Sequence, residues 1–185
     1  MENKDKIILD LCGGTGAWSE PYRKAGYDVR VITLPENDVR TYQPPENVYG
    51  ILAAPPCTEF SLAKNSQPRD FKGGMSIVTA CLDIIWKCRE RGSLKWWALE
   101  NPRGFLRQFL GRPAYHFEGW WFGDKIKKPT DIWGYFNEPK KMKNPVRPEY
   151  PRKGKGSWAN KARGGDPKRS ITPAGFAQAF FKANQ

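Results

Sequence analysis

Short apolar runs alternate with stretches of mixed polarity along the first hundred residues. Four of these runs end at Gly, Pro or charged residues and predict buried strands, at 7–11, 29–32, 48–54 and 95–99. Apolar residues at helical spacing predict helices from about 19 to 25 and from about 75 to 91, closed by Gly26 and Gly92. Strands that alternate with helices predict an α/β fold with a parallel sheet, in which ligands bind at the carboxyl ends of the strands.

The length of 185 residues and a hydrophobic content of 39% predict a single domain over residues 1–185. The sequence contains no run of about 18 apolar residues, so we expect neither a spanning helix nor a membrane partner. The first residues lead into a strand pattern rather than a signal peptide, which favours a cytoplasmic protein with reduced thiols.

The four cysteines form no Cys-x-x-Cys pair, and His116 is the only histidine. This pattern argues against a Cys/His zinc site, and we expect no metal. Cys81 and Cys88 fall on the apolar helical pattern and are predicted to lie in the core. Cys12 falls in a glycine-rich turn, where a packing role is expected.

Positive charge is concentrated in one part of the chain. Lys and Arg outnumber Asp and Glu by 31 to 19, and the net charge of +12 favours a polyanion such as nucleic acid or an acidic membrane. Residues 125–170 hold 14 Lys and Arg against four acids, with six prolines and five aromatic residues. This region is either a solvated loop or a nucleic-acid surface, with cations on phosphates and aromatic rings available for bases. Composition alone does not separate the two.

A glycine-rich turn, Asp-Leu-Cys-Gly-Gly-Thr-Gly at 10–16, ends the first predicted strand. Glycines allow a tight turn and close approach of a ligand, and the helix that follows offers free N–H groups. The turn is neither a complete G-x-G-x-x-G motif nor a P-loop. By itself it fits any nucleotide or adenosine-type ligand, or a purely structural turn.

The sequence Ala-Pro-Pro-Cys at 54–57 ends the third predicted strand. Two prolines restrict the backbone and hold Cys57 at the strand tip. Because a partly ionised thiol is strongly nucleophilic, Cys57 is a candidate nucleophile.

Two carboxylates also follow predicted strands. Glu100, in Leu-Glu-Asn-Pro at 99–102, is bounded by apolar sequence, and partial desolvation would let it donate a proton near neutral pH. Asp38 could accept a hydrogen bond from an adenine amino group. Each could instead be a capping or solvated residue.

Together, these elements resemble the DNA cytosine-5 methyltransferases. That family has an Asp-Leu-x-x-Gly-x-Gly turn for S-adenosylmethionine, a Pro-Cys nucleophile and a Glu-Asn acid, which correspond here to 10–16, 56–57 and 100–101. The sequence Arg-Ser-Ile-Thr at 169–172 is similar to the family's last motif, which opens a helix that returns to the cofactor pocket. The resemblance implies a Rossmann-like sheet with flanking helices.

The resemblance also implies roles for individual residues. Those assigned to S-adenosylmethionine are Asp10, Leu11, Cys12, Gly13, Gly14, Thr15, Gly16, Trp18, Thr33, Leu34, Asp38, Val39 and Pro55. Those assigned to catalysis are Cys57, Glu100 and Lys128, the last in place of an arginine that contacts the target base. Those assigned to nucleic acid are Ser61, Lys140, Lys141, Lys143, Arg147, Arg163 and Arg169.

Three features depart from the family. No acid stands directly after the second strand for the ribose hydroxyls, because Thr33 and Leu34 occupy that place. The Gln-x-Arg-x-Arg motif has only a degenerate counterpart at 123–130. The basic, Pro/Gly-rich segment at about 136–169 stands where the family has a full target-recognition domain.

These departures leave alternatives open. The partner is expected to be DNA, but RNA fits the same chemistry, and a separate recognition subunit could be required. The chain could also be a regulator that binds cofactor and nucleic acid without catalysis. An amino-methyltransferase is disfavoured because its Asp/Asn-Pro-Pro-Tyr/Phe signature is replaced by Ala-Pro-Pro-Cys.

Overall fold

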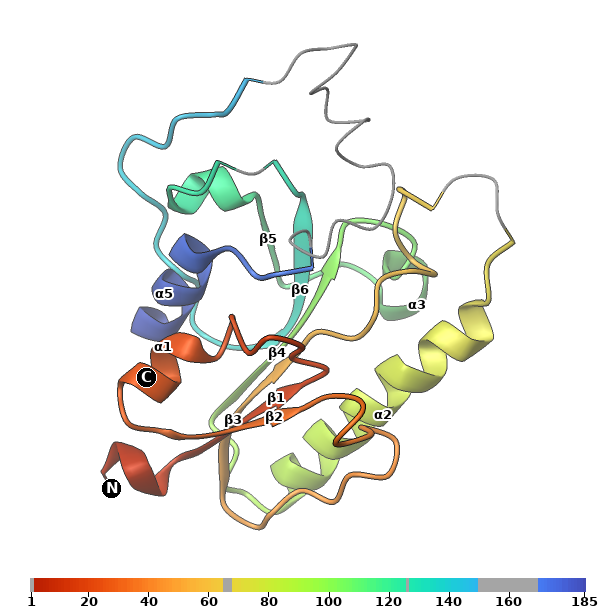
Figure 1. Cartoon of the computed structure of the whole chain (residues 1–185), viewed down its shortest axis with the longest axis vertical. Coiled ribbons are helices and arrows are strands. Elements are labelled where there is room, and N and C mark those ends of the chain that lie inside the picture. The colour runs from red at the N-terminus through yellow and green to blue at the C-terminus, as the bar shows by residue number, and fades with distance from the viewer. Residues whose placement is uncertain (1, 65–67, 126, 150–169) are drawn as a thin grey trace.

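The computed structural model describes residues 2–64, 68–125, 127–149 and 170–185. These residues form a mixed α/β fold around a six-stranded sheet in the order β2-β1-β3-β4-β6-β5 (Figure 1). The strands are β1 (Ile7–Leu11), β2 (Asp28–Ile32), β3 (Val48–Ala53), β4 (Trp96–Pro102), β5 (Tyr115–Phe117) and β6 (Thr130–Tyr135). The α-helices are α1 (Glu20–Lys24), α2 (Phe71–Glu90), α3 (Arg107–Leu110) and α5 (Ala174–Ala183), and the 3-10 helices are η1 (Asn3–Asp5) and η2 (Gly119–Phe122).

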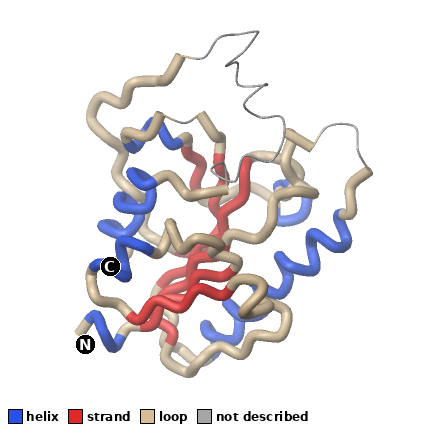
Figure 2. The backbone as a smooth tube through the Cα atoms, viewed as in Figure 1, coloured by secondary structure: helices blue, strands red, loops and turns tan. Residues whose placement is uncertain are grey.

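Helices cover both faces of the sheet. Figures 1 and 2 show α2 and α3 on one side and α1 and α5 on the other. Neighbouring residues of a strand point to opposite faces, so Leu9 and Ile51 pack with α2 while Ile8 and Leu52 pack with Trp18 and the aromatic residues of α5. Burial on both faces explains why the strands are continuous apolar runs.

The predicted strands and helices are confirmed, and the largest shifts of their boundaries are at the start of α2 and the end of β4. Helix α2 begins at Phe71, four residues earlier than the apolar spacing predicts. The Asp70 side chain accepts a hydrogen bond from the backbone N–H of Gly73, 2.8 Å away, and so caps an additional helical turn.

The prediction of a wholly parallel sheet is wrong at one edge. Strands β1 to β4 are parallel, but β6 pairs antiparallel with both β4 and β5. Strand β4 therefore continues through Pro102, with Glu100 opposite Ile132 and Asn101 opposite Asp131. The sequence predicts a stop at Glu100, but pairing with β6 extends the strand by three residues.

The basic region is not one continuous loop. Its first part contains β6, an internal strand of the sheet, and Trp133 on that strand is 6% exposed. Trp133 is therefore a core residue, contrary to the expectation that its ring is available for bases. Residues 150–169 of the basic region, with Arg163 and Arg169, lie outside the described residues.

The sheet order gives a topological switch point beside β1, and the region outside the carboxyl ends of β1 and β3 is here called the crevice. Strand β1 lies between β2 and β3, so the connection from β1 leads to one side of it and the connection from β2 to β3 crosses back to the other side. At such a switch point the loops after adjacent strands separate, and ligands bind outside their carboxyl ends. The glycine turn after β1 and the Pro-Pro-Cys sequence after β3 flank this point.

Candidate functional site

The glycine turn after β1 has a left-handed backbone at three of its residues. Cys12, Gly14 and Gly16 have φ values of 56°, 53° and 70°. A Cβ at Gly13 would lie 2.4 Å from Cγ of Asp10, so a side chain there would displace the carboxyl group. A Cβ at Gly14 would have no neighbour within 4 Å, so the outer side of the turn is open. The turn therefore packs on Asp10 and exposes its backbone outward.

Asp10 lies beneath this turn rather than on its surface. The carboxyl group is fully buried and accepts a hydrogen bond of 2.6 Å from the Ser19 hydroxyl, while Oδ1 has no partner among the described residues. Burial raises the pKa of Asp10 to about 6, against the smaller opposing effect of the Ser19 hydrogen bond. Asp10 thus places negative charge under the turn, where it can orient backbone N–H groups.

The residues assigned to the cofactor divide by exposure. Those with accessible surface around the crevice are Cys12, Gly13, Gly14, Thr15, Thr33, Leu34 and Asp38. Those that are buried are Asp10, Leu11, Gly16, Trp18, Val39 and Pro55. The Trp18 ring packs against Phe176 and Phe180 of α5, so it supports the crevice from within the core.

Asp38 faces the glycine turn from the loop after β2. Its carboxylate bonds to the Arg40 guanidinium and backbone N–H, which lower the pKa of Asp38 to about 2. The pKa of Cys12 is lowered, chiefly by its hydrogen bond with Cys81, and the negative charge of Asp38 is a smaller opposing effect. The exposed part of the crevice thus carries one carboxylate that stays ionised at neutral pH.

The loops after β3 and β4 are joined to each other. The side-chain amide of Asn101 donates to the carbonyl oxygen of Pro55, 3.0 Å away, and this bond is buried. Beyond it, the backbone N–H of Phe105 donates to Phe60 at 2.9 Å, and Ser61 forms an isolated bridge with Gly104. These bonds fix the segment that carries Cys57 against the segment that carries Glu100.

Cys57 begins a tight turn at the tip of β3. Its carbonyl oxygen accepts hydrogen bonds from the backbone N–H groups of Phe60 and Ser61, at 3.0 and 2.8 Å. Ala53 pairs with Leu99 in the sheet, so the turn of Cys57 begins four residues beyond the end of β3, next to the strand that carries Glu100. Cys57 itself does not line the pocket that contains Glu100.

Glu100 contributes an unpartnered oxygen to a small pocket. Its Oε2 is buried and has no hydrogen-bond partner among the described residues. The pocket has a volume of about 10 Å³, enough for about one water molecule, and is also lined by Lys128, Thr130 and Thr172. The structure therefore brings together Glu100, Lys128 and a residue of the Arg-Ser-Ile-Thr sequence that precedes α5.

Cys12 also contacts a cysteine of helix α2. Its Sγ lies 4.0 Å from Sγ of Cys81, and this hydrogen bond lowers the pKa of Cys12 while that of Cys81 is raised. Cys81 and Cys88 are fully buried, as predicted, whereas Cys12 and Cys57 are half-buried. The packing role expected for Cys12 is met through Cys81, and part of its surface still faces the crevice.

A buried carboxylate with an arginine and a histidine as partners lies beside this site and is not evident from the sequence pattern. Asp131 on β6 is fully buried and accepts hydrogen bonds from Nε and Nη2 of Arg107, at 2.6 and 2.5 Å. Nδ1 of His116 lies 2.8 Å from Oδ1 of Asp131, the oxygen that also accepts from Nη2 of Arg107. The one available signal is an acid inside the apolar run of β6. Asp131 is opposite Asn101, so this cluster stabilises the strand that carries Glu100.

Arg107→Ala is expected to lower the free energy of unfolding by about 3 kcal/mol, because it removes two bonds to a buried carboxylate. Arg112→Ala is the matched control, since Arg112 is exposed in the same loop region and should change stability by about 0.5 kcal/mol or less. Urea denaturation of both variants measures the difference. Equal effects of the two substitutions would contradict a structural role for the Asp131 cluster.

The basic residues assigned to nucleic acid lie on the segment after β6. Lys140, Lys141, Lys143 and Arg147 are exposed, and Nζ of Lys141 lies 3.5 Å from the centre of the Trp121 ring. Ser61, by contrast, is half-buried in the turn after Cys57. The structure thus places the described lysines on the α5 side of the sheet and Ser61 at its carboxyl edge.

Three further findings concern metal sites, membrane-spanning helices and comparison with known proteins. In the part of the chain that the structure describes, no group of three or more His, Cys, Asp or Glu could hold a metal ion. Within the same part, each helix is too short or too polar to cross a membrane. The chain matches no protein-family model and no curated protein sequence.

Proposed function

We propose that this chain is a minimal DNA cytosine-5 methyltransferase that uses S-adenosylmethionine. The observation that carries the proposal is the junction between the β3 and β4 tips, where Asn101 binds the Pro55 carbonyl beside Cys57 and Glu100. This bond supports the proposal because it holds the loop that carries Cys57 against the strand that carries Glu100, whose carboxyl group has one buried, unpartnered oxygen, at the carboxyl edge of an α/β sheet. The sheet order and crossovers are compatible with a Rossmann-like methyltransferase domain.

The crevice beside β1 has the properties that an adenosine-type cofactor requires. The turn is open on its outer side at Gly14, and the charge of Asp10 lies beneath it. Thr33 and Asp38 supply polar groups from the loop after β2, although no acid stands at the usual ribose position. When bound there, S-adenosylmethionine supplies an electrophilic methyl group.

The proposed reaction assigns separate roles to Cys57 and Glu100. The thiolate of Cys57 adds to C6 of cytosine, the electron pair of the C5–C6 double bond shifts to form a C4–C5 double bond, and the C4–N3 pair moves onto N3, which makes C5 enamine-like and nucleophilic. Glu100 donates a hydrogen bond or proton to N3 and stabilises the charge that develops there. After methylation of C5, a base removes the C5 proton, the double bond re-forms and Cys57 leaves.

The target base must leave the helical stack before this chemistry occurs. Extrusion of a stacked base costs about a few kcal/mol, which contacts with the phosphates must offset. The exposed lysines after β6 supply positive charge for this purpose. Because the described chain has no separate recognition domain, a partner subunit could provide sequence selection.

The proposal is tested by nucleoside mass spectrometry after incubation of the protein with S-adenosylmethionine and unmethylated DNA. We expect 5-methyldeoxycytidine, with a parallel tRNA sample remaining unmodified. Modification of tRNA alone would keep the mechanism but overturn DNA as the substrate. Binding of the cofactor without modification of either polymer would instead indicate a regulator or a subunit that needs its partner.

The accessible cysteines provide a separate test of the cofactor site. We expect iodoacetamide to alkylate Cys12 and Cys57, which are half-buried, before Cys81 and Cys88, which are fully buried. S-adenosylmethionine at about ten times its Kd should slow alkylation of Cys12 about tenfold by mass action. Peptide mass spectrometry measures each rate, and an unchanged rate at Cys12 would place the cofactor elsewhere.

A further inference from the structure

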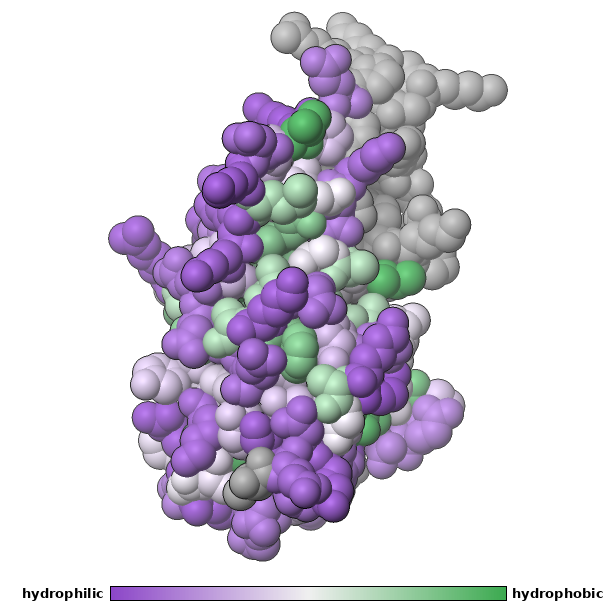
Figure 3. All heavy atoms as spheres, turned by 90° about the vertical axis from the view of Figure 1, so that its left-hand side faces the viewer, coloured by the Kyte–Doolittle hydropathy of each residue, from purple (hydrophilic) through white to green (hydrophobic). Residues whose placement is uncertain are grey.

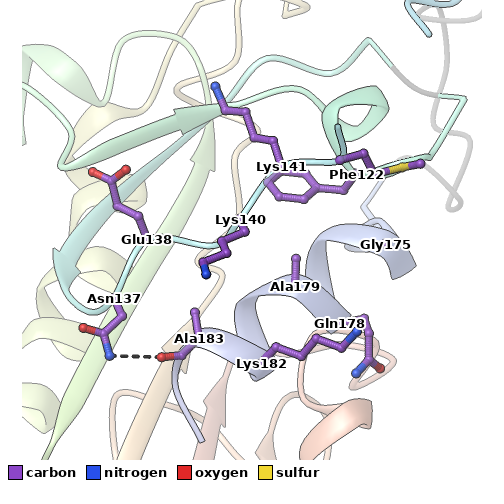
Figure 4. A pocket seen from close by; sticks show the side chains of 11 residues that line it. Phe122, Asn137, Glu138, Lys140, Lys141, Gly175, Gln178, Ala179, Lys182 and Ala183 are labelled. Atoms are coloured by element: carbon purple, nitrogen blue, oxygen red, sulfur yellow. Dashed lines mark hydrogen bonds between the residues drawn. The ribbon is translucent and has the colours of Figure 1, made fainter. Parts of the chain in front are cut away.

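A groove lies between α5 and residues 137–142, a segment here called the strap. It has a volume of about 740 Å³ (Figure 4) and shares no lining residue with the small pocket of Glu100. Its apolar floor includes Phe122, Met142 and Ala179, and Figure 4 shows Ala179 pointing toward the strap. Pockets of about 300–1,000 Å³ are the size at which proteins hold nucleotide-sized ligands.

Hydrogen bonds fix the strap at both ends. At one end, the backbone N–H of Asn137 donates to Oδ1 of Asn184 at 2.7 Å, and the Asn184 amide donates back to the Asn137 carbonyl at 3.0 Å. At the other end, the backbone N–H of Met142 donates to the carbonyl of Trp121, 3.0 Å away. The groove is therefore a built feature of the fold, with walls held by the C-terminal end of α5 and by η2.

Positive charge is placed on both walls of the groove. Lys140 extends from the strap into the gap, and Lys182 lies on α5 (Figure 4). Neither forms an ion pair with an acidic residue in the described part of the chain. Glu138 is the one acid that lines the groove, and its carboxylate points away from α5 in Figure 4. Figure 3 shows that this side of the molecule is mostly polar, with apolar patches between the polar side chains.

The groove is adjacent to the proposed catalytic pocket. Gly175 lines the groove, and the next residue, Phe176, lines the pocket of Glu100. A Cβ at Gly175 would lie 2.1 Å from the Phe122 carbonyl oxygen, so the first turn of α5 packs directly against η2 between the two sites. The two sites are thus close in the chain but separated by this packed contact, and a strand with its base at Glu100 would have to pass around the start of α5 to reach the groove.

We infer that the groove binds a nucleotide unit of the substrate strand next to the reacting base. Lys140 and Lys182 bind its phosphate, and the apolar floor contacts the sugar and base. A phosphate interacts favourably with the two lysine cations, and the flat apolar face of a base packs on the apolar floor. A nucleotide therefore contacts both the charged and the apolar residues that line the groove. The inference rests on the proposed function, because it takes nucleic acid as the substrate.

The test is fluorescence anisotropy with a labelled single-stranded DNA of about 12 nucleotides, within the site sizes of single-strand binding proteins. We expect the double variant Lys140→Gln/Lys182→Gln to weaken binding about tenfold at low salt and to make the slope of log K against log salt shallower by about 1.4. The matched control is Lys87→Gln/Lys95→Gln, which removes two exposed lysines that do not line the groove. Ala179→Leu should weaken binding without changing the salt slope, because it fills the floor and removes no charge.

The results separate this inference from the proposed function. Equal losses of DNA affinity in the test and control variants would contradict binding at the groove, because they would indicate only a diffuse effect of net charge. Competition by free deoxycytidine monophosphate as strong as by the oligonucleotide would overturn a strand site in favour of a free nucleotide. If the wild-type protein methylates DNA and Lys140→Gln/Lys182→Gln binds DNA with unchanged affinity, the assignment of the groove is wrong and the proposed function stands. Groove-dependent binding without methyl transfer would overturn the proposed function alone.

Discussion

Cys57→Ala is expected to reduce methyl transfer to cytosine by about a thousandfold or more, while the affinity for S-adenosylmethionine stays within about twofold. The reason is that C5 of an intact cytosine ring is a weak nucleophile, and only addition of the thiolate to C6 activates it. The side chain of Cys57 is small, and its backbone makes the hydrogen bonds that hold the turn, so alanine preserves the loop. Radiolabelled methyl transfer measures the rate, and calorimetry measures cofactor binding.

The neighbouring Thr58→Ala is the control for this substitution. Thr58 is exposed and lies in the same turn, so its loss should leave the rate within about twofold. If Cys57→Ala retained a rate within about tenfold of the wild type, nucleophilic catalysis by Cys57 would be wrong. Equal losses in both variants would instead indicate damage to the turn.

Asp10→Asn is expected to raise the free energy of unfolding by about 3 kcal/mol at pH 7 and to weaken cofactor binding. Burial raises the pKa of Asp10 from 3.8 to about 6, so ionisation of the folded protein at neutral pH is costly. Each unit of pKa difference corresponds to about 1.36 kcal/mol. Asparagine cannot ionise, and its side-chain oxygen can still accept the hydrogen bond from Ser19.

The difference in unfolding free energy between Asp10→Asn and the wild type is expected to depend on pH. Below about pH 4, Asp10 is protonated in both the folded and the unfolded state, and Asp10→Asn should match the wild type. Between about pH 4 and 6 the unfolded state has lost the proton while the folded state keeps it, so wild-type stability falls as pH rises. Above about pH 6 the difference is constant. Urea denaturation at several pH values measures this difference, and a variant less stable than the wild type at pH 7 would contradict the account.

The sequence predicts the central strands and the two main helices because their signals are local. Apolar runs of β1 and β3 are buried on both faces, and Gly26 follows α1 with a φ of 84°, as a helix stop requires. The antiparallel strand β6 is not predicted, because its residues lie in a region whose composition is dominated by Lys, Arg and Pro. Its position in the sheet depends on pairing with β4, which no local pattern specifies.

The candidate site is predictable in part. The placement of Cys57 and Glu100 toward the carboxyl edge of the sheet follows from the pattern, since parallel strands align their carboxyl ends, although β4 continues past Glu100 to Pro102. The bond from Asn101 to Pro55 joins residues 46 positions apart, and the sequence alone gives no sign of it. The same holds for Asp131, whose partners Arg107 and His116 come from α3 and β5. Such contacts depend on the register of neighbouring strands rather than on residue spacing.

The most direct test of the central claim is the intact mass of the protein after reaction with S-adenosylmethionine and an oligonucleotide containing 5-fluorocytosine. Fluorine at C5 cannot leave as a proton does, so the strand should remain bonded to Cys57 after methyl transfer. We predict a species with the mass of protein, oligonucleotide and one methyl group, present in the wild type and absent in Cys57→Ala. Methylation of ordinary cytosine without any such adduct would contradict covalent catalysis by Cys57.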